Sequence, residues 1–201
     1  MKTWTMMAER PLAARPASWT TLALVCLWLL FTGAAHAQGD IFGGKKTVDV
    51  EAVFKEGLKK RGTVLDLAGK KIGDEGLKKL LASPLAAKVK QLDLRYNEIS
   101  PEGAKALAAA PPLPELTVLI LRHNFFADEG TVAFAKTSSF PNLKILELGW
   151  NEIRDAGALA LGESQAFPKL GKLDLRGNFL AGTTKDALRK SLGHLKSLKL
   201  Y

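Results

Sequence analysis

The sequence has very few of the side chains that most often bind metals or form covalent links. Among its 201 residues are one cysteine, Cys26, and three histidines, of which His36 lies with Cys26 in an N-terminal leader. We therefore expect the folded part of the chain to contain no disulfide, no cysteine nucleophile and no cysteine-ligated metal. The two remaining histidines, His123 and His194, are too few for a histidine-rich metal site.

The sequence also lacks an apolar run long enough to span a membrane. Its most apolar stretch, residues 21–31, has about 11 residues, whereas a spanning helix needs roughly 20. Basic residues precede this stretch and Ala35-His36-Ala37 follows it, which is the three-part pattern of a secretory signal peptide. We predict a signal peptide over residues 1–37, cleavage near Ala37–Gln38 and a periplasmic or extracellular location. A retained membrane anchor is the alternative.

Acidic residues are scarce near both ends of the predicted mature chain. Residues 45–79 carry ten lysines and arginines against six acidic residues, and residues 171–201 carry seven against two. Residues 97–170 have the opposite balance, with six basic residues against nine acidic ones. Nucleic-acid binding needs one continuous basic face, which this distribution does not predict. Basic ends instead favour solubility or attraction to an anionic surface.

What the sequence does contain is one unit repeated at a fixed spacing. Leucines, an asparagine and a further apolar residue recur with a period of 27 residues, as in Leu92, Leu94 and Leu119, Leu121. The asparagines of this period are Asn97, Asn124, Asn151 and Asn178. A fixed period in this range predicts a solenoid of stacked units.

Each unit combines a strand with a helix. The Leu-x-Leu alternation predicts a short strand with its leucines on one side, and about 15 residues of helical pattern follow it. Strand, helix and strand in the same sense build a parallel sheet with helices on one face and right-handed crossovers. The asparagines follow the strands, where their amides can replace backbone hydrogen bonds, so we predict an internal structural ladder. Close packing between units is predicted by a recurring glycine at Gly76, Gly103, Gly130 and Gly157.

The two ends of the array are irregular. Residues 38–61 are predicted to form a flexible entry and then an amphipathic capping helix from about Asp49 to Arg61. The repeat domain is predicted over residues 62–201, with five units of about 27 residues and a partial sixth that has a strand without a helix. The last strand leaves an unpaired edge, which is a route to weak self-association.

The motif Leu-x-x-Leu-x-Leu-x-x-Asn-x-Leu, present as residues 143–153, resembles that of the leucine-rich repeat family. The pattern Asp155-Ala156-Gly157-Ala158-x-x-Leu161 is similar to the helix of its ribonuclease-inhibitor-like class. The resemblance covers residues 62–201. It implies an α/β fold, a right-handed solenoid with parallel strands on the concave face and helices on the convex face. It also implies binding of other proteins through the concave face, although the short array and the missing C-terminal cap depart from the family pattern.

The repeat register predicts three columns of side chains on the exposed strand face. The columns are acidic at Asp93, Glu147 and Asp174, basic at Arg95, Arg122 and Arg176, and mainly aromatic at Tyr96, His123 and Trp150. Adjacent strands lie about 4.8 Å apart, so the columns are contiguous. Aromatic side chains beside arginine are typical of binding hot spots, and we predict these residues as the partner-binding site. The alternative is that acids and arginines neutralise each other within a strand and that Trp150 packs sideways on its neighbours.

The predicted function is non-enzymatic recognition of a protein or peptide, with no cofactor and no nucleic acid. The alternative is a structural protein held to an anionic polymer or lipid by its basic ends. Glu147 and Asp174 superficially resemble an acid/base pair, but an open sheet face cannot exclude water or shift their pKa values much. The projected strand face is of order 400 Å², below the roughly 800 Å² per side of a standard interface. A small or extended ligand is therefore favoured, with the arginines selecting its acidic groups.

Overall fold

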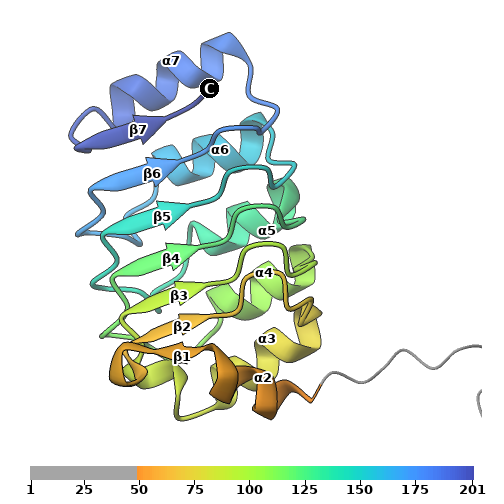
Figure 1. The fold of residues 1–201 in the computed structure, drawn as a ribbon. Coiled ribbons are helices and arrows are strands. Elements are labelled where there is room, and N and C mark those ends of the chain that lie inside the picture. The colour runs from red at the N-terminus through yellow and green to blue at the C-terminus, as the bar shows by residue number, and fades with distance from the viewer. Residues whose placement is uncertain (1–48) are drawn as a thin grey trace, which may run out of the picture. The chain divides into compact units, whose positions relative to one another are not determined.

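Seven strands form one sheet, and their order in the sheet is their order along the chain (Figure 1). The computed structural model describes residues 49–201, so the predicted signal peptide and the entry segment up to residue 48 lie outside the described residues. Strands β2 to β7 pair in parallel, and β1 pairs with β2 in the antiparallel sense. The strands are β1 (Leu58–Lys59), β2 (Val64–Asp66), β3 (Gln91–Asp93), β4 (Val118–Ile120), β5 (Ile145–Glu147), β6 (Lys172–Asp174) and β7 (Ser197–Lys199).

Helices alternate with the parallel strands and cover one face of the sheet (Figure 1). They are α2 (Val50–Gly57), α3 (Gly73–Ala82), α4 (Pro101–Ala108), α5 (Ala127–Phe134), α6 (Asp155–Gly162) and α7 (Gly182–Ser191), with short 3₁₀ turns η1 (Lys60–Gly62) and η2 (Ala86–Lys88). The predicted α/β repeat fold is confirmed. Within residues 49–201, no helix has the length and apolar character that crossing a membrane requires.

The helices are shorter than the helical pattern in the sequence predicted. Helices α3 to α7 have eight or ten residues each, in place of about 15. A proline disfavours helical backbone at the residue before it, which fits the end of α3 at Ala82, two residues before Pro84. Pro111, Pro141 and Pro168 lie three, seven and six residues past the ends of α4, α5 and α6. The remainder of each unit is a turn or extended segment that returns the chain to the next strand.

Three of the four recurring glycines, Gly103, Gly130 and Gly157, lie where adjacent helices approach each other, whereas the atoms nearest Gly76 belong to Ile72 of its own repeat. A Cβ atom added at Gly130 of α5 would lie 2.6 Å from the Cβ of Ala104 and 3.1 Å from the Cα of Pro101, both in α4. At Gly157 of α6, an added Cβ would lie 2.7 Å from Asp128 Oδ1 in α5. A larger residue at these positions would force the helices apart, which confirms the prediction of close packing.

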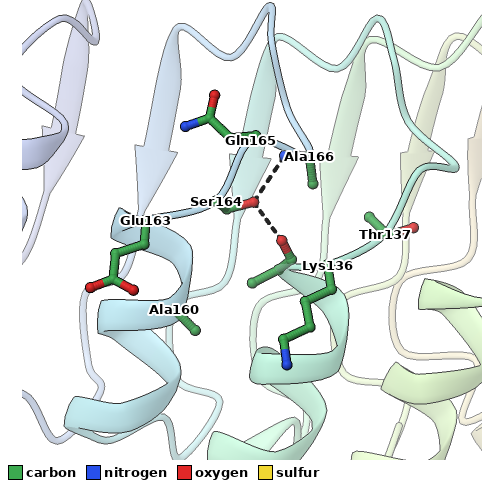
Figure 2. Close-up of a pocket in the computed structure, with 8 residues that line it drawn as sticks. Lys136, Thr137, Ala160, Glu163, Ser164, Gln165 and Ala166 are labelled. Atoms are coloured by element: carbon green, nitrogen blue, oxygen red, sulfur yellow. Dashed lines mark hydrogen bonds between the residues drawn. The ribbon is translucent and has the colours of Figure 1, made fainter.

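Hydroxyl side chains tie the loop after a helix to the preceding repeat. Ser164 Oγ donates a hydrogen bond of 2.5 Å to the carbonyl oxygen of Ala135 and accepts one of 3.0 Å from the Ala166 N–H (Figure 2). One repeat earlier, Thr137 Oγ1 donates to the carbonyl oxygen of Ala108 at 2.7 Å. A shallow pocket of about 490 Å³ lies beside these bonds, between the ends of α5 and α6. Alanines and polar side chains line it, as expected of a gap between two tied loops.

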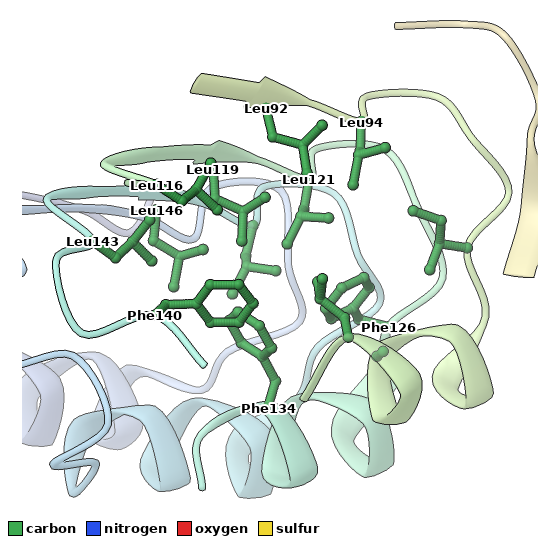
Figure 3. Packing of buried hydrophobic residues seen from close by; sticks show 14 of the residues in the cluster. Leu92, Leu94, Leu116, Leu119, Leu121, Phe126, Phe134, Phe140, Leu143 and Leu146 are labelled. Atoms are coloured by element: carbon green, nitrogen blue, oxygen red, sulfur yellow. The ribbon is translucent and has the colours of Figure 1, made fainter. Parts of the chain in front are cut away.

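The core lies between the sheet and the helices and runs through every repeat. Leu92 of β3 pairs with Leu119 of β4, and Leu119 pairs with Leu146 of β5, so the 27-residue period is also the register of the sheet. All three leucines are buried. Phenylalanines from the third repeat, among them Phe134 and Phe140, fill the space behind these leucines (Figure 3). Burial of stacked leucine columns is the main source of stability here, because the described residues contain no disulfide.

The N-terminal end differs from the predicted helix over residues 49–61. Helix α2 begins after Asp49, whose side chain caps it by accepting a 3.2 Å hydrogen bond from the Ala52 N–H, and it ends at Gly57. A Cβ at Gly57 would lie 2.6 Å from the Asp66 carbonyl oxygen, so the chain passes close to β2 at this point. It then forms β1 and a turn with left-handed backbone at Lys60 and Arg61. The helix is shorter because these residues pair with β2.

The C-terminal end of the sheet is expected to open more readily than its centre. Within residues 49–201, strand β7 has a neighbour on one side only, and its Leu198 is partly exposed. Solenoid stability is roughly a sum over neighbouring units. Hydrogen exchange should therefore find the amides of residues 195–201 far less protected than those of residues 143–148. Equal protection of the two segments would contradict this expectation.

Candidate functional site

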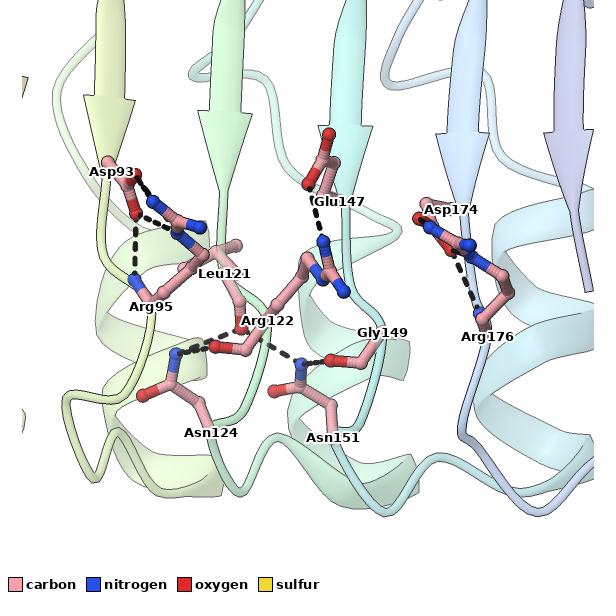
Figure 4. Close-up of polar contacts among 10 residues, drawn as sticks. All are labelled: Asp93, Arg95, Leu121, Arg122, Asn124, Glu147, Gly149, Asn151, Asp174 and Arg176. Atoms are coloured by element: carbon pink, nitrogen blue, oxygen red, sulfur yellow. Dashed lines mark hydrogen bonds and ion pairs between the residues drawn. The ribbon is translucent and has the colours of Figure 1, made fainter. Parts of the chain in front are cut away.

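Two arginines of the predicted site bind the aspartate two residues before them (Figure 4). Arg95 Nη2 donates to Asp93 Oδ2 at 2.7 Å, and Arg176 Nη2 donates to Asp174 Oδ2 at 2.6 Å. In each pair the backbone N–H of the arginine also donates to the aspartate Oδ1, at 3.1 Å. Both aspartates are buried. On these two strands, acids and arginines therefore neutralise each other.

Arg122 has no such partner on its own strand. Strands β3 and β6 end in an aspartate, whereas β4 ends in Ile120. The Arg122 guanidinium extends towards β5, where Nη1 lies 3.8 Å from Glu147 Oε2 and Cζ lies 4.8 Å from the ring centre of Trp150. Arg122 thus connects the acidic column to the aromatic column.

Ion pairing also lowers the pKa of Asp174. Burial raises the pKa of Asp174, but the hydrogen bonds from Arg176 outweigh this effect and hold the pKa of the carboxyl group below its usual value. The same hydrogen bonds raise the pKa of Arg176, and hydrogen bonds to Asp93 raise the pKa of Arg95. The strand face therefore carries ion pairs, and its arginines are largely compensated.

Tyr96, His123 and Trp150 form a continuous stack of rings, called here the aromatic stack. The ring centres of Tyr96 and His123 are 4.2 Å apart, those of His123 and Trp150 are 4.8 Å apart, and the planes of each pair meet at 11°. Trp150 then lies over Gly177, where an added Cβ would come within 2.4 Å of the indole Nε1. Burial, assisted by two neighbouring arginines, holds the pKa of His123 below its usual value, so the middle ring is neutral at about pH 7.

The stacked residues hold a backbone conformation that is unusual for residues with side chains. Tyr96 and His123 have φ angles of 56° and Trp150 has one of 55°, whereas the equivalent residues of the first and fifth repeats are Gly69 at 70° and Gly177 at 71°. Left-handed backbone costs roughly 1–2 kcal/mol for a residue other than glycine. Each stacked pair contributes about 0.5–1.5 kcal/mol in return, which offsets part of that cost. Backbone strain that persists at neighbouring residues is typical of functional surfaces.

A groove of about 460 Å³ lies beside the aromatic stack, at the carboxyl ends of the strands. All three residues of the stack line it, and the acidic and arginine columns do not. The other side of the groove contains residues that the sequence reasoning did not select, namely Lys71, Glu98, Phe125, Glu152 and Phe179. Four aromatic side chains of the groove are exposed: Tyr96 by 53%, Trp150 by 39%, Phe125 by 48% and Phe179 by 59%. The apolar part of the site is therefore wider than predicted.

The repeat contained a signal for this second row. Its members directly follow the position of the ladder asparagine, so they recur with the same period of 27 residues. Two of them, Phe125 and Phe179, are phenylalanines in turns, where a buried role is not expected. The predicted columns end at the position before the asparagine, so they do not include these turn residues.

The asparagines form a ladder of hydrogen bonds with the backbone (Figure 4). Asn124 Oδ1 accepts from the N–H groups of Asn97 at 3.1 Å and Ile99 at 3.0 Å. Its Nδ2 donates to the carbonyl oxygens of Leu94 and Leu121, both at 2.9 Å. One side chain thus satisfies backbone groups of two repeats at the point where the ladder of the sheet ends.

The ladder is interrupted at Asn151, whose buried Oδ1 has no hydrogen-bond partner within residues 49–201. The cause is the turn of the third repeat. Glu98 and Glu152 hold left-handed backbone at φ 59°, but Phe125, which occupies the equivalent position, does not, and Ala127 is left-handed instead. The backbone N–H groups of this turn therefore do not reach Oδ1 of Asn151 in the next repeat.

A family model described as Leucine Rich repeat matches residues 63–81, 86–108 and 141–162. The three matches contain β2 with α3, β3 with α4, and β5 with α6. These three segments are similar to leucine-rich repeats, and the repeating parallel strand–helix units of the sheet are consistent with that family. Such domains are typically protein-binding modules and are generally non-catalytic. A comparison with curated proteins finds no match.

The leucine-rich repeat face offers little for catalysis. Glu147 and Asp174 pair across β5 and β6, as the acid/base interpretation required. A general acid needs a carboxyl group with a raised pKa, whereas that of Asp174 is lowered. Across residues 49–201, no cluster of three or more His, Cys, Asp or Glu side chains is arranged to hold a metal ion. The groove and the aromatic stack are therefore the candidate site.

Proposed function

We propose that this leucine-rich repeat domain is an exported binding module that recognises a protein or peptide ligand through its strand face. Export rests on the leader pattern of residues 1–37 with cleavage near Ala37–Gln38, and the intact mass of the protein from its native host tests it. Assignment to the ribonuclease-inhibitor-like class rests on the helix pattern of residues 155–161. The observation that carries the binding function is the aromatic stack, which is strained, partly exposed and beside a groove.

The dimensions of the groove favour an extended ligand. A volume of about 460 Å³ falls in the range of roughly 300–1,000 Å³ of small-ligand sites, and it accommodates a few side chains rather than a broad protein surface. The paired arginines flank the groove as fixed ion pairs. Aromatic side chains therefore supply most of the contact area, as at protein-binding hot spots.

Replacing Trp150 with alanine should weaken binding by about 2 kcal/mol or more, the loss typical of a hot spot. Peptides selected from a random display library against residues 38–201 provide the ligands, and isothermal titration calorimetry measures their affinity. Residues 38–201 contain the whole compact unit that begins at Val48. Lys136→Ala, on the helix side beside the small pocket, is the matched control and should change the affinity little. Equal losses for the two variants would contradict the assignment to the strand face.

Basic residues at the C-terminal end support the second candidate, attachment to an anionic surface. Helix α7 carries Lys185, Arg189 and Lys190 with Asp186 as its one acidic residue, and Lys196 and Lys199 follow. Repeating the titrations at two ionic strengths separates the candidates. Association through exposed charges should collapse as salt shortens the screening length to about 8 Å at 0.15 M. Recognition centred on Trp150 should change little.

A further inference from the structure

The two ends of the aromatic stack differ in a way that shows where a ligand group fits. At the β6 end, the indole of Trp150 occupies the space above Gly177, so this end is closed. Gly69 holds the equivalent register position next to β2, with φ of 70°, and no atom lies within 4 Å of the Cβ position built on it. The stacking direction therefore continues past Tyr96 into an open position above Gly69, called here the Tyr96 slot.

The outer face of Tyr96 borders this slot. Its other face stacks on His123 at 4.2 Å, yet 53% of the residue remains exposed. Within residues 49–201, cation–ring contacts occur at Trp150, Phe179 and Tyr201, and none occurs at Tyr96. Successive strands are about 4.8 Å apart, so one further planar group fits the spacing of the stack.

The charge around the slot favours a cation. Glu98 and Glu152 line the same groove, against one cation, Lys71. Lys71 Nζ lies 3.1 Å from Glu98 Oε1, and both side chains are exposed, by 72% and 56%. Exposed ion pairs of this kind contribute little to stability, so a ligand cation can bind the carboxylate of Glu98 together with Lys71 or in its place.

We propose that the Tyr96 slot binds the guanidinium group of an arginine in the ligand. The guanidinium is planar and charged, so it stacks on the face of Tyr96 and donates hydrogen bonds from its edge to Glu98. Lysine has the charge without the plane, and phenylalanine has the plane without the charge. This inference rests on the proposed function, because it names the ligand chemistry of the same groove. The proposed preference of the groove for a basic side chain differs from the acidic preference expected of the arginine column, which lies outside the groove lining.

The direct test compares four pentapeptides, Ac-Ala-Ala-X-Ala-Ala-NH₂, in which X is arginine, citrulline, lysine or phenylalanine. The sequence has two tyrosines, so Tyr201→Phe in residues 38–201 leaves the Tyr96 ring as a single NMR reporter. The arginine peptide should shift the Tyr96 ring signals and bind about two- to five-fold more tightly than the citrulline and lysine peptides, the range of an exposed cation–ring contact. Equal affinities, or no shift with the arginine peptide at millimolar concentration, overturn the inference.

Two variants locate the contact. Gly69→Tyr places a ring of the chain itself in the slot, at a φ angle of 70° close to the 56° that Tyr96 adopts, and it should abolish the preference for arginine. Tyr96→Leu removes the ring face and should have the same effect if Gly69→Tyr fails to fold, whereas Tyr96→Phe should retain the preference. An unchanged preference in the folded Gly69→Tyr or in the Tyr96→Leu variant overturns the inference.

Failure of the slot and failure of the proposed function give different results. If the phenylalanine peptide binds best and Trp150→Ala weakens it, the groove binds peptides and the slot assignment is wrong. If library-selected peptides keep full affinity for the Trp150→Ala variant, the strand-face function itself is wrong.

Discussion

Replacing Asn124 with alanine should lower the free energy of unfolding by about 2–5 kcal/mol. The side chain satisfies the N–H groups of Asn97 and Ile99 and donates to two carbonyl oxygens. Alanine would leave two backbone donors without a partner, and a buried unsatisfied group costs about 1–3 kcal/mol. Loss of the bonds to the Leu94 and Leu121 carbonyl oxygens should cost less free energy, because each oxygen has a second lone pair that can accept a hydrogen bond. Denaturant unfolding followed by circular dichroism measures the change.

Asn151 supplies the matched comparison for this prediction. It is also fully buried and donates to the carbonyl oxygens of Leu121 and Gly149. Its Oδ1 accepts no hydrogen bond within the described residues, so Asn151→Ala leaves no backbone N–H unsatisfied. We therefore expect a clearly smaller loss than for Asn124→Ala. If the two variants were equally destabilised, the loss of stability could not be attributed to the unsatisfied N–H groups of Asn97 and Ile99.

The repeat period explains why so much of this domain could be predicted from the sequence. In-register parallel strands place equivalent residues of successive repeats side by side. The same arithmetic that aligned Leu92 with Leu119 therefore also aligned Tyr96 with His123 and Trp150, and Asn97 with Asn124. Columns on the sheet follow from the period alone, without knowledge of any side-chain conformation.

Features that depend on side-chain direction or on a single turn could not be predicted in this way. Arg122 lies near Glu147 of the neighbouring strand because its own strand has Ile120 where β3 and β6 have an aspartate. The interruption at Asn151 depends on the φ angle of Phe125, which the period does not specify. The turn residues of the groove recur with the period, but whether their side chains face the stack depends on the path of each turn, which the period does not specify.

The second large effect is expected in the core, where Phe134→Ala should lower the free energy of unfolding by about 3–5 kcal/mol. Phe134 is fully buried, and its ring lies 6.1 Å from that of Phe126, 5.5 Å from that of Phe140 and 5.3 Å from that of Phe167. Phe167 belongs to the following repeat, so the substitution creates a cavity and also weakens the contact between two units.

Phe179→Ala is the control for Phe134→Ala, because it removes the same side chain from an exposed position. Phe179 is 59% exposed and lies under Arg154, whose Cζ is 5.3 Å from the ring centre. Phe179→Ala should therefore change stability by no more than about 0.5 kcal/mol, as surface substitutions usually do. Because stability in a solenoid depends on contacts between neighbouring units, Phe134→Ala should also broaden the denaturant transition, as the repeats on its two sides become less strongly coupled. A transition that moved to lower denaturant with an unchanged slope would show that the cavity acts on the whole array at once and that Phe134 does not couple its halves.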